Sequence, residues 1–174
     1  EDCPGFLTQK WTDAQLEATY EGPESVQRRQ LTMTMTMDLF LEQFRQWIAE
    51  MQQIEGQYPK MGACALAKAM ELWLWTLEHL QGAKDAHGAK LYRTPRQGVT
   101  FTMADALSWL VGVRQFMLDV IELAEKGPEN PVVAEGLEGL LNFMRDLSRV
   151  QTTKVIGEVG RICAELVYAY NAHG

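Results

Sequence analysis

Large apolar residues recur every three or four positions along most of this 174-residue chain, which is the spacing of one helix face. The pattern is clearest after Ser25, where it continues to about residue 54 through Leu39, Phe40, Phe44, Trp47, Ile48 and Met51. We therefore expect one long helix over residues 25–54, with Ser25 as its N-cap. Residues 60–85 are apolar on nearly every side, so the helix expected there should lie at the centre of the fold.

Capping residues and helix breakers delimit the other expected helices. The pattern predicts further helices over residues 12–19, 102–126, 130–149 and 152–172. Thr102 followed by Asp105 resembles a capping box, and Gly127-Pro128 should end the helix that begins at Thr102. Residues 86–100 are rich in glycine and proline and are expected to form a linker, which at this length is usually exposed or functional.

Residues 32–37 alternate threonine with methionine, a period of two that is more typical of a strand than of a helix. A helix is nevertheless predicted here, because no other segment of the chain has strand character and could pair with it. The predicted fold class is therefore all-α, an antiparallel bundle of five main helices after residue 11 without a sheet. Residues 1–54 and the bundle formed by 55–174 are expected to fold as one unit.

Charge and cysteine content narrow the range of partners. The formal net charge is −7, which makes nucleic acid an improbable partner. Three widely spaced cysteines without a C-x-x-C motif favour reduced thiols in a cytoplasmic compartment. No apolar run reaches the ~18 residues of a membrane-spanning helix, so no membrane span is expected. The chain starts at Glu1 without a signal peptide, and we expect it to be processed or cut from something longer.

Cofactor sites built from histidine or from aromatic clusters are not favoured by the sequence. A di-iron site in a bundle needs Glu-x-x-His on facing helices, and none of the three histidines follows that motif, so no metal site is predicted. Five aromatic residues at helical spacing are interpreted as core rather than as cofactor contacts: Trp73, Trp75, Phe101, Trp109 and Phe116.

Glu21 is the main candidate for chemistry. It stands in a short polar segment between two helical patterns, followed by Gly22 and Pro23. Glycine allows the backbone to approach a flat ligand closely, and proline suits the first turn of a helix. A carboxylate at such a junction could be directed at a bound substrate. Taken alone, Glu21 is equally well explained as an acid favoured by the dipole of a helix N-terminus.

The neighbours of Glu21 point to one family. Residues 20–28 are Y-E-G-P-E-S-V-Q-R, which resembles the Y-E-G-T-x-x-I-Q-R signature of acyl-CoA dehydrogenases. Asp13-Ala14 stands upstream at the family's spacing, and residues 1–4 resemble the E-D-x-P stretch that follows the family's flavin loop. Residues 103–107 and 157–161 resemble the C-terminal extension of some members. One departure is Pro23, which replaces a threonine and so removes a hydroxyl and a backbone donor.

The resemblance implies roles for five residues and a cofactor. Glu21 corresponds to the catalytic base that removes the α-proton of an acyl-CoA thioester, and Gly22 to a substrate-contacting residue. Pro23, Glu24 and Ser25 match positions that contact FAD. The implied fold is the all-α C-terminal domain of these enzymes, and the implied reaction is α,β-dehydrogenation.

The resemblance also implies partners. The β-domain and flavin loop of the family have no counterpart here, so a second polypeptide should carry them, together with the N-terminal helices. An acyl-CoA substrate, electron-transfer flavoprotein as acceptor, and an oligomeric assembly are expected. The alternative is a non-catalytic helical assembly or adaptor subunit, in which the Met-rich and aromatic helices form an interface and Glu21 is only a helix-terminus acid.

Overall fold

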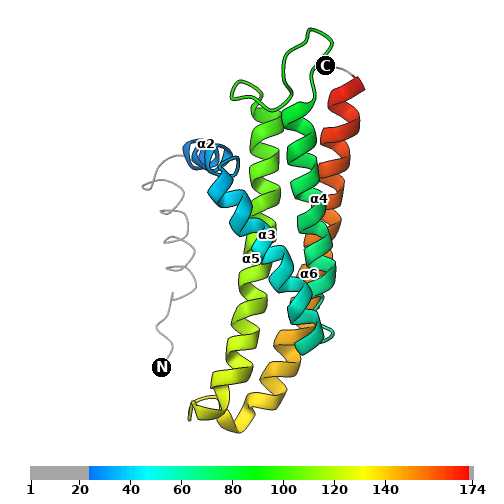
Figure 1. Ribbon diagram of the computed structural model, residues 1–174. Helices are drawn as coiled ribbons and strands as arrows, with labels where there is room; N and C mark the ends of the chain where they lie inside the picture. The colour runs from blue at the N-terminus through cyan, green and yellow to red at the C-terminus, as the bar shows by residue number, and fades with distance from the viewer. Residues whose placement is uncertain (1–23, 173–174) are drawn as a thin grey trace, which may run out of the picture.

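The computed structural model describes residues 24–172, which form a bundle of α-helices (Figure 1). The α-helices are α2 (Glu24–Thr34), α3 (Asp38–Gln57), α4 (Ala63–Gly82), α5 (Gln97–Lys126) and α6 (Leu137–Ala172). Two short 3₁₀ turns, η1 (Gly127–Glu129) and η2 (Ala134–Gly136), join α5 to α6. Within the described residues there is no strand, only a single bridge between Lys84 and Lys90, so the all-α prediction is confirmed.

Helices α4, α5 and α6 lie side by side and alternate in direction, and α3 crosses them obliquely (Figure 1). The indole of Trp73, on α4, is wholly buried and donates a hydrogen bond from Nε1 to the carbonyl of Met103 at 3.0 Å. The Phe44 ring of α3 packs against the same indole with centroids 4.8 Å apart. Helix α4 is therefore central as predicted, although Trp75 faces outward and is 54% exposed. No helix in this part of the chain is long and apolar enough to cross a membrane.

The single helix expected over residues 25–54 is wrong, because the chain breaks between α2 and α3. The break falls within the threonine–methionine segment, where the hydroxyl of Thr36 donates to the carbonyl of Met33 at 2.9 Å. Threonine hydroxyls that bond to the preceding turn compete with helical hydrogen bonds. The side chain of Met35 is fully buried while those of Met33 and Met37 are exposed, so burial of Met35 fixes the direction change. The segment forms neither the continuous helix nor a strand.

Helix α5 begins at Gln97, so Thr102 is not its cap. The Thr102 hydroxyl lies inside the helix and donates to the carbonyl of Gly98 at 2.6 Å. The earlier start buries Val99 and Thr100, which a linker through residue 100 would leave exposed. The predicted end of this helix at Gly127-Pro128 is confirmed, since α5 stops at Lys126.

Helices predicted over residues 130–149 and 152–172 are one continuous helix, α6, which begins only at Leu137. No glycine or proline stands between Gly139 and Gly157, so nothing in the backbone interrupts the helix near residue 150. Asn130 instead forms a turn, in which its side-chain oxygen accepts from the backbone N–H of Val132 at 3.0 Å.

The expected linker is an ordered loop over residues 83–96. The carboxylate of Asp85 accepts the backbone N–H groups of Ala89 and His87, each at 2.9 Å, and pairs with Arg96. These interactions lower the pKa of Asp85, and the hydrogen bond from the backbone of Ala89 has the largest effect. Tyr92 donates its hydroxyl to the carbonyl of Thr32 at 2.7 Å. Through this hydrogen bond, the loop between α4 and α5 is attached to the C-terminal half of α2.

Two glycine substitutions test the turn that leads into α4. Gly62 has φ +89°, and a Cβ there would lie 3.1 Å from the Cγ2 of Thr152, so Gly62→Ala should cost about 1–3 kcal/mol of unfolding free energy. Gly157 lies inside α6 with open space around it, so Gly157→Ala should gain about 0.5–1 kcal/mol. Urea unfolding of both variants measures the difference. Equal stability of the two variants would contradict this description of the turn.

Candidate functional site

Two of the five predicted site residues lie in the described part of the chain, at the start of α2. Glu24 is the first residue of the helix and pairs with Arg28 one turn later at 2.7 Å. Ser25 is the second helical residue, so the prediction that it is the N-cap is wrong. Glu21, Gly22 and Pro23 lie outside the described residues.

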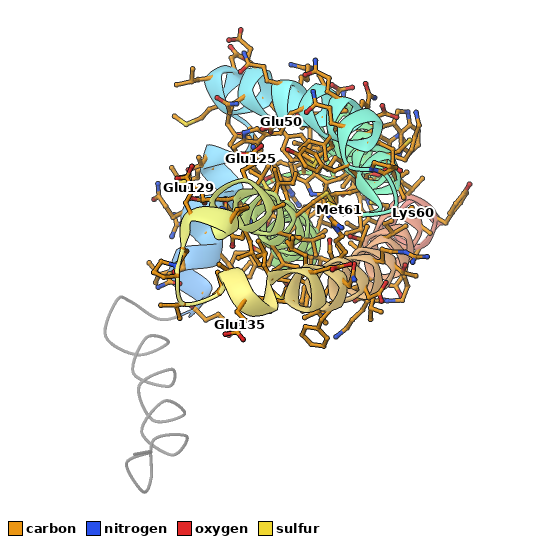
Figure 2. The ribbon with its side chains drawn as sticks, turned by 90° about the horizontal axis from the view of Figure 1, so that it is seen from below. Glu50, Lys60, Met61, Glu125, Glu129 and Glu135 are labelled. Carbon is orange, nitrogen blue, oxygen red and sulfur yellow. The ribbon has the colours of Figure 1, made fainter. Side chains whose placement is uncertain are left out.

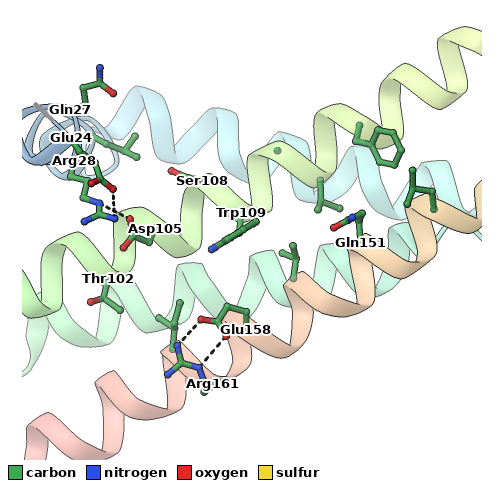
Figure 3. A pocket seen from close by; sticks show the side chains of 17 residues that line it. Glu24, Gln27, Arg28, Thr102, Asp105, Ser108, Trp109, Gln151, Glu158 and Arg161 are labelled. Carbon is green, nitrogen blue, oxygen red and sulfur yellow. Dashed lines mark hydrogen bonds and ion pairs between the residues drawn. The ribbon is translucent and has the colours of Figure 1, made fainter. Parts of the chain in front are cut away.

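A cleft of about 990 Å³ begins at Glu24 and extends between α2, α5 and α6 (Figure 3). Its apolar wall is formed by Leu31, Trp109, Val113, Phe116, Leu147, Val155 and Ile162. Its polar edge carries charged side chains from all three helices. Because the first turn of α2 forms one end of the cleft, the chain enters this helix at the cleft edge.

Arg28 holds α2 against α5. Its Nε lies 2.9 Å from the carboxylate of Asp105, while its second nitrogen pairs with Glu24 inside α2. The sequence resemblance matched Arg28 in type but assigned it no role, and the capping-box pattern predicted a capping role for Asp105. The structure instead makes these two residues an ion pair between helices. The i, i+4 spacing of Glu24 and Arg28 allows their ion pair to be predicted from the sequence. The ion pair of Arg28 with Asp105 joins two helices, and no sequence pattern predicts it.

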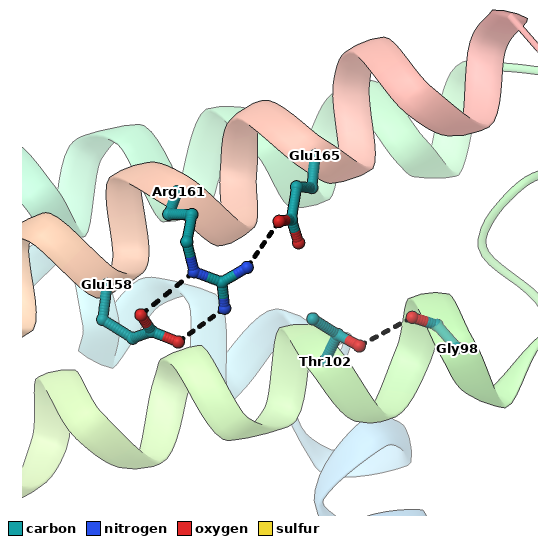
Figure 4. Close-up of polar contacts among 5 residues, drawn as sticks. All are labelled: Gly98, Thr102, Glu158, Arg161 and Glu165. Atoms are coloured by element: carbon teal, nitrogen blue, oxygen red, sulfur yellow. Dashed lines mark hydrogen bonds and ion pairs between the residues drawn. The ribbon is translucent and has the colours of Figure 1, made fainter.

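The other charged edge of the cleft lies on α6. Arg161 binds Glu158 at 2.6 Å and Glu165 at 2.5 Å through different guanidinium nitrogens (Figure 4). The hydrogen bond with Arg161 lowers the pKa of Glu158, and both carboxylates raise the pKa of Arg161. Each cleft arginine is thus already shared by two carboxylates, so a free anion would find no unpaired cation among the residues that line the cleft.

Trp109 gives the cleft an exposed aromatic surface. Its side chain is 46% exposed, and the ammonium of Lys154 lies 5.8 Å from the ring centroid. The interpretation of the five aromatic residues as core is therefore correct for Trp73 but wrong for Trp109 and Trp75. Helical spacing alone did not distinguish them, because α5 is apolar on more than one face.

The first turn of α2 is the feature of the cleft that could contact a phosphate of the flavin nucleotide that the resemblance implies. The first turn of a helix has backbone N–H groups without helical partners, and these suit a phosphate oxygen. Ser25 adds a hydroxyl to that turn, while the carboxylate of Glu24 beside it opposes an anion. The two arginines that line the rest of the cleft are already paired with carboxylates, so cations for the pyrophosphate would have to come from another surface.

Other cofactor types find no support in this part of the chain. Among residues 24–172 no three histidine, cysteine or acidic side chains are grouped closely enough to hold a metal ion. Cys64 is exposed and Cys163 is buried, both as free thiols, and burial raises the pKa of Cys163.

No family model, curated protein or solved structure matches the chain. The resemblance to acyl-CoA dehydrogenases therefore depends chiefly on residues 1–28 and stays a prediction.

Removing the carboxylate of Asp105 should loosen α2 selectively. Asp105→Asn takes away the charge that binds Arg28, and exposed ion pairs are worth about 0.2–1 kcal/mol. Amide hydrogen exchange in α2 should therefore accelerate up to about fivefold, with α4 unchanged. Asp119→Asn is the control, because Asp119 is exposed and bonds only to Gln115 within α5. If both variants change α2 equally, Arg28 and Asp105 do not hold this helix.

Proposed function

We propose that this chain is the C-terminal part of a flavin-dependent acyl-CoA dehydrogenase, which converts an acyl-CoA thioester into its α,β-unsaturated form. One observation carries the proposal. Residues 24–28 of the signature-like segment form the first turns of α2, and these turns form one end of the 990 Å³ cleft.

Glu21 supports the proposal through its chemistry. The α C–H of a thioester is weakly acidic, so its removal requires a carboxylate whose pKa is raised by desolvation. In the proposed reaction the α-proton passes to the carboxylate of Glu21, the β-hydrogen leaves as hydride, and a C=C bond forms between the two carbons. FAD, when bound, accepts the hydride. Electron-transfer flavoprotein is the proposed acceptor of the two electrons.

Helix α2 supports the cofactor part of the proposal. Its first turn offers backbone N–H groups and the hydroxyl of Ser25 to a phosphate oxygen, and Arg28 offsets the charge of Glu24 there. Pro23 and Gly22 precede this turn in the sequence, so cofactor and substrate contacts would come from consecutive residues. The pair between Arg28 and Asp105 would keep that turn in a fixed position on the bundle.

A second polypeptide is part of the proposal. Large apolar side chains are exposed on and between α2 and α3, with Leu39 80%, Met37 60% and Met33 58% exposed. Monomeric proteins seldom leave several such side chains uncovered in one region. We propose that the polypeptide carrying the N-terminal and β-domains covers this region and completes the flavin site, in an oligomeric enzyme of the cytoplasm.

A non-catalytic assembly or adaptor subunit is the second candidate. It is favoured by exposed apolar side chains on α6, where Phe143 and Val150 are each 62% exposed. An adaptor needs such surfaces and needs neither flavin nor a base. The two candidates differ in whether Glu21 is required for turnover.

Glu21→Gln in the assembled enzyme tests the proposal. The amide is nearly isosteric with the carboxylate but cannot accept the α-proton. Dehydrogenation should slow by about 10²–10⁴-fold, the usual effect of losing a general base, with far less change in substrate binding. Stopped-flow measurement of flavin reduction by acyl-CoA gives the rate.

Glu24→Gln is the matched control. Glu24 is an exposed acid three residues along the chain, and its carboxylate is accounted for by the pair with Arg28. Its loss should leave the rate within a few-fold of the unmodified enzyme. Full activity of Glu21→Gln, or a larger defect in Glu24→Gln, would show that Glu21 is not the base.

A further inference from the structure

A second cavity, of about 440 Å³, lies where the turn between α3 and α4 faces α6. The turn contributes Lys60 and its neighbours, and α6 contributes Asn142, Arg145, Asp146 and Arg149. The end-on view shows Lys60 beside α6, on the opposite side of the bundle from Glu129 and Glu135 (Figure 2). This cavity is separate from the cleft at α2 and shares no lining residue with it.

The cavity is basic in a chain that is acidic as a whole. Three cations, Lys60, Arg145 and Arg149, face the single carboxylate of Asp146 among the lining residues, although the net charge of the chain is −7. Arg149 pairs with Asp146 at 3.6 Å, a long contact between two exposed side chains. Within the described residues neither Lys60 nor Arg145 forms an ion pair. Two cationic groups at the cavity are therefore available to an anion.

Nearby acids are bound to other groups. The two oxygens of Glu55 accept the backbone N–H groups of Lys60 and Cys64, at 3.4 and 3.1 Å. Glu125 accepts the hydroxyl of Tyr58 at 2.7 Å. Neither carboxylate lines the cavity, and each is directed at a neutral donor rather than at Lys60, Arg145 or Arg149 side chains.

The backbone holds Lys60 at the mouth of this cavity in an uncommon conformation. Its φ is +74°, the only positive value for a non-glycine residue in the described chain. The next side chain, Met61, is 1% exposed and anchors the turn in the core. Strained backbone of this kind persists where the surroundings fix it, and it is frequent at ligand sites. On α6, residues 142, 145 and 149 share one helix face, so both guanidinium groups lie on the same side of the cavity.

We propose that this cavity binds a phosphate group of a small-molecule ligand. Guanidinium groups match two phosphate oxygens at once, while an ammonium group adds a point charge, and Arg145, Arg149 and Lys60 supply both. The side-chain amide of Asn142 adds a neutral donor at the same wall. A cavity of about 440 Å³ has room for a phosphate together with further atoms of a ligand. The proposal is independent of the proposed dehydrogenase function.

Calorimetric titration of the full 174-residue chain with inorganic phosphate and with pyrophosphate tests the proposal. Both should bind saturably at one site in low-salt chloride buffer, and affinity should fall as salt is added. Pyrophosphate should bind more tightly than phosphate, because it carries more negative charge and more acceptor oxygens for the three cations. Absence of saturable binding for both anions would overturn the proposal.

Three substitutions and a control locate the site. Arg145→Gln and Arg149→Gln should each weaken phosphate binding about tenfold, the usual loss for one charge-assisted hydrogen bond. Lys60→Asn should have a similar effect while keeping the turn, because asparagine tolerates positive φ. Arg45→Gln is the control, since Arg45 is an exposed arginine paired with Glu78 on another face. Unchanged binding in a folded Arg145→Gln/Arg149→Gln variant, or equal weakening by Arg45→Gln, would overturn the assignment.

Discussion

Burial of one tryptophan joins three helices of this protein. The indole of Trp73 on α4 is fully buried, packs at a tilt against the ring of Phe44 of α3 and donates to the carbonyl of Met103 on α5. Tryptophan removes the largest apolar surface of any side chain from water, about 150–250 Å², and its N–H needs a partner when buried. The arrangement of α3, α4 and α5 thus depends on this contact, and α5 in turn carries the surface on which α2 lies.

Helix α2 illustrates how the bundle supports the candidate site. An isolated helix of 11 residues is marginal in water, so its position has to come from tertiary contacts. Arg28 ties its first half to Asp105, and the hydroxyl of Tyr92 ties its second half to the carbonyl of Thr32. The buried Met35 then fixes the turn into α3. In the proposed dehydrogenase, these contacts would hold the first turn of α2, and with it the end of the signature-like segment, in a fixed position on the bundle.

Apolar periodicity and helix-breaking residues predicted the features of the fold that depend on neighbouring residues in the sequence. The all-α class and the end of α5 at Gly127-Pro128 follow from periodicity and helix breakers. A helix start near Ser25 was also predicted, but Ser25 lies inside the first turn of α2 rather than at its N-cap. The break at residues 35–37 and the early start of α5 depend on burial of Met35 and Val99, which tertiary packing decides. The pair of Arg28 with Asp105 joins residues far apart in sequence, so no local pattern could predict it. The roles of Glu21, Gly22 and Pro23 remain predictions.

If this chain is one part of a flavoenzyme, the complex that it forms in its native state contains the rest of the enzyme. The measurement is native mass spectrometry, combined with visible absorption, of the complex recovered through this chain. We expect a larger second polypeptide in a symmetric assembly, with bound FAD and the yellow colour of oxidised flavin. Recovery of only colourless, stable 19.7-kDa protomers would contradict it and favour an adaptor.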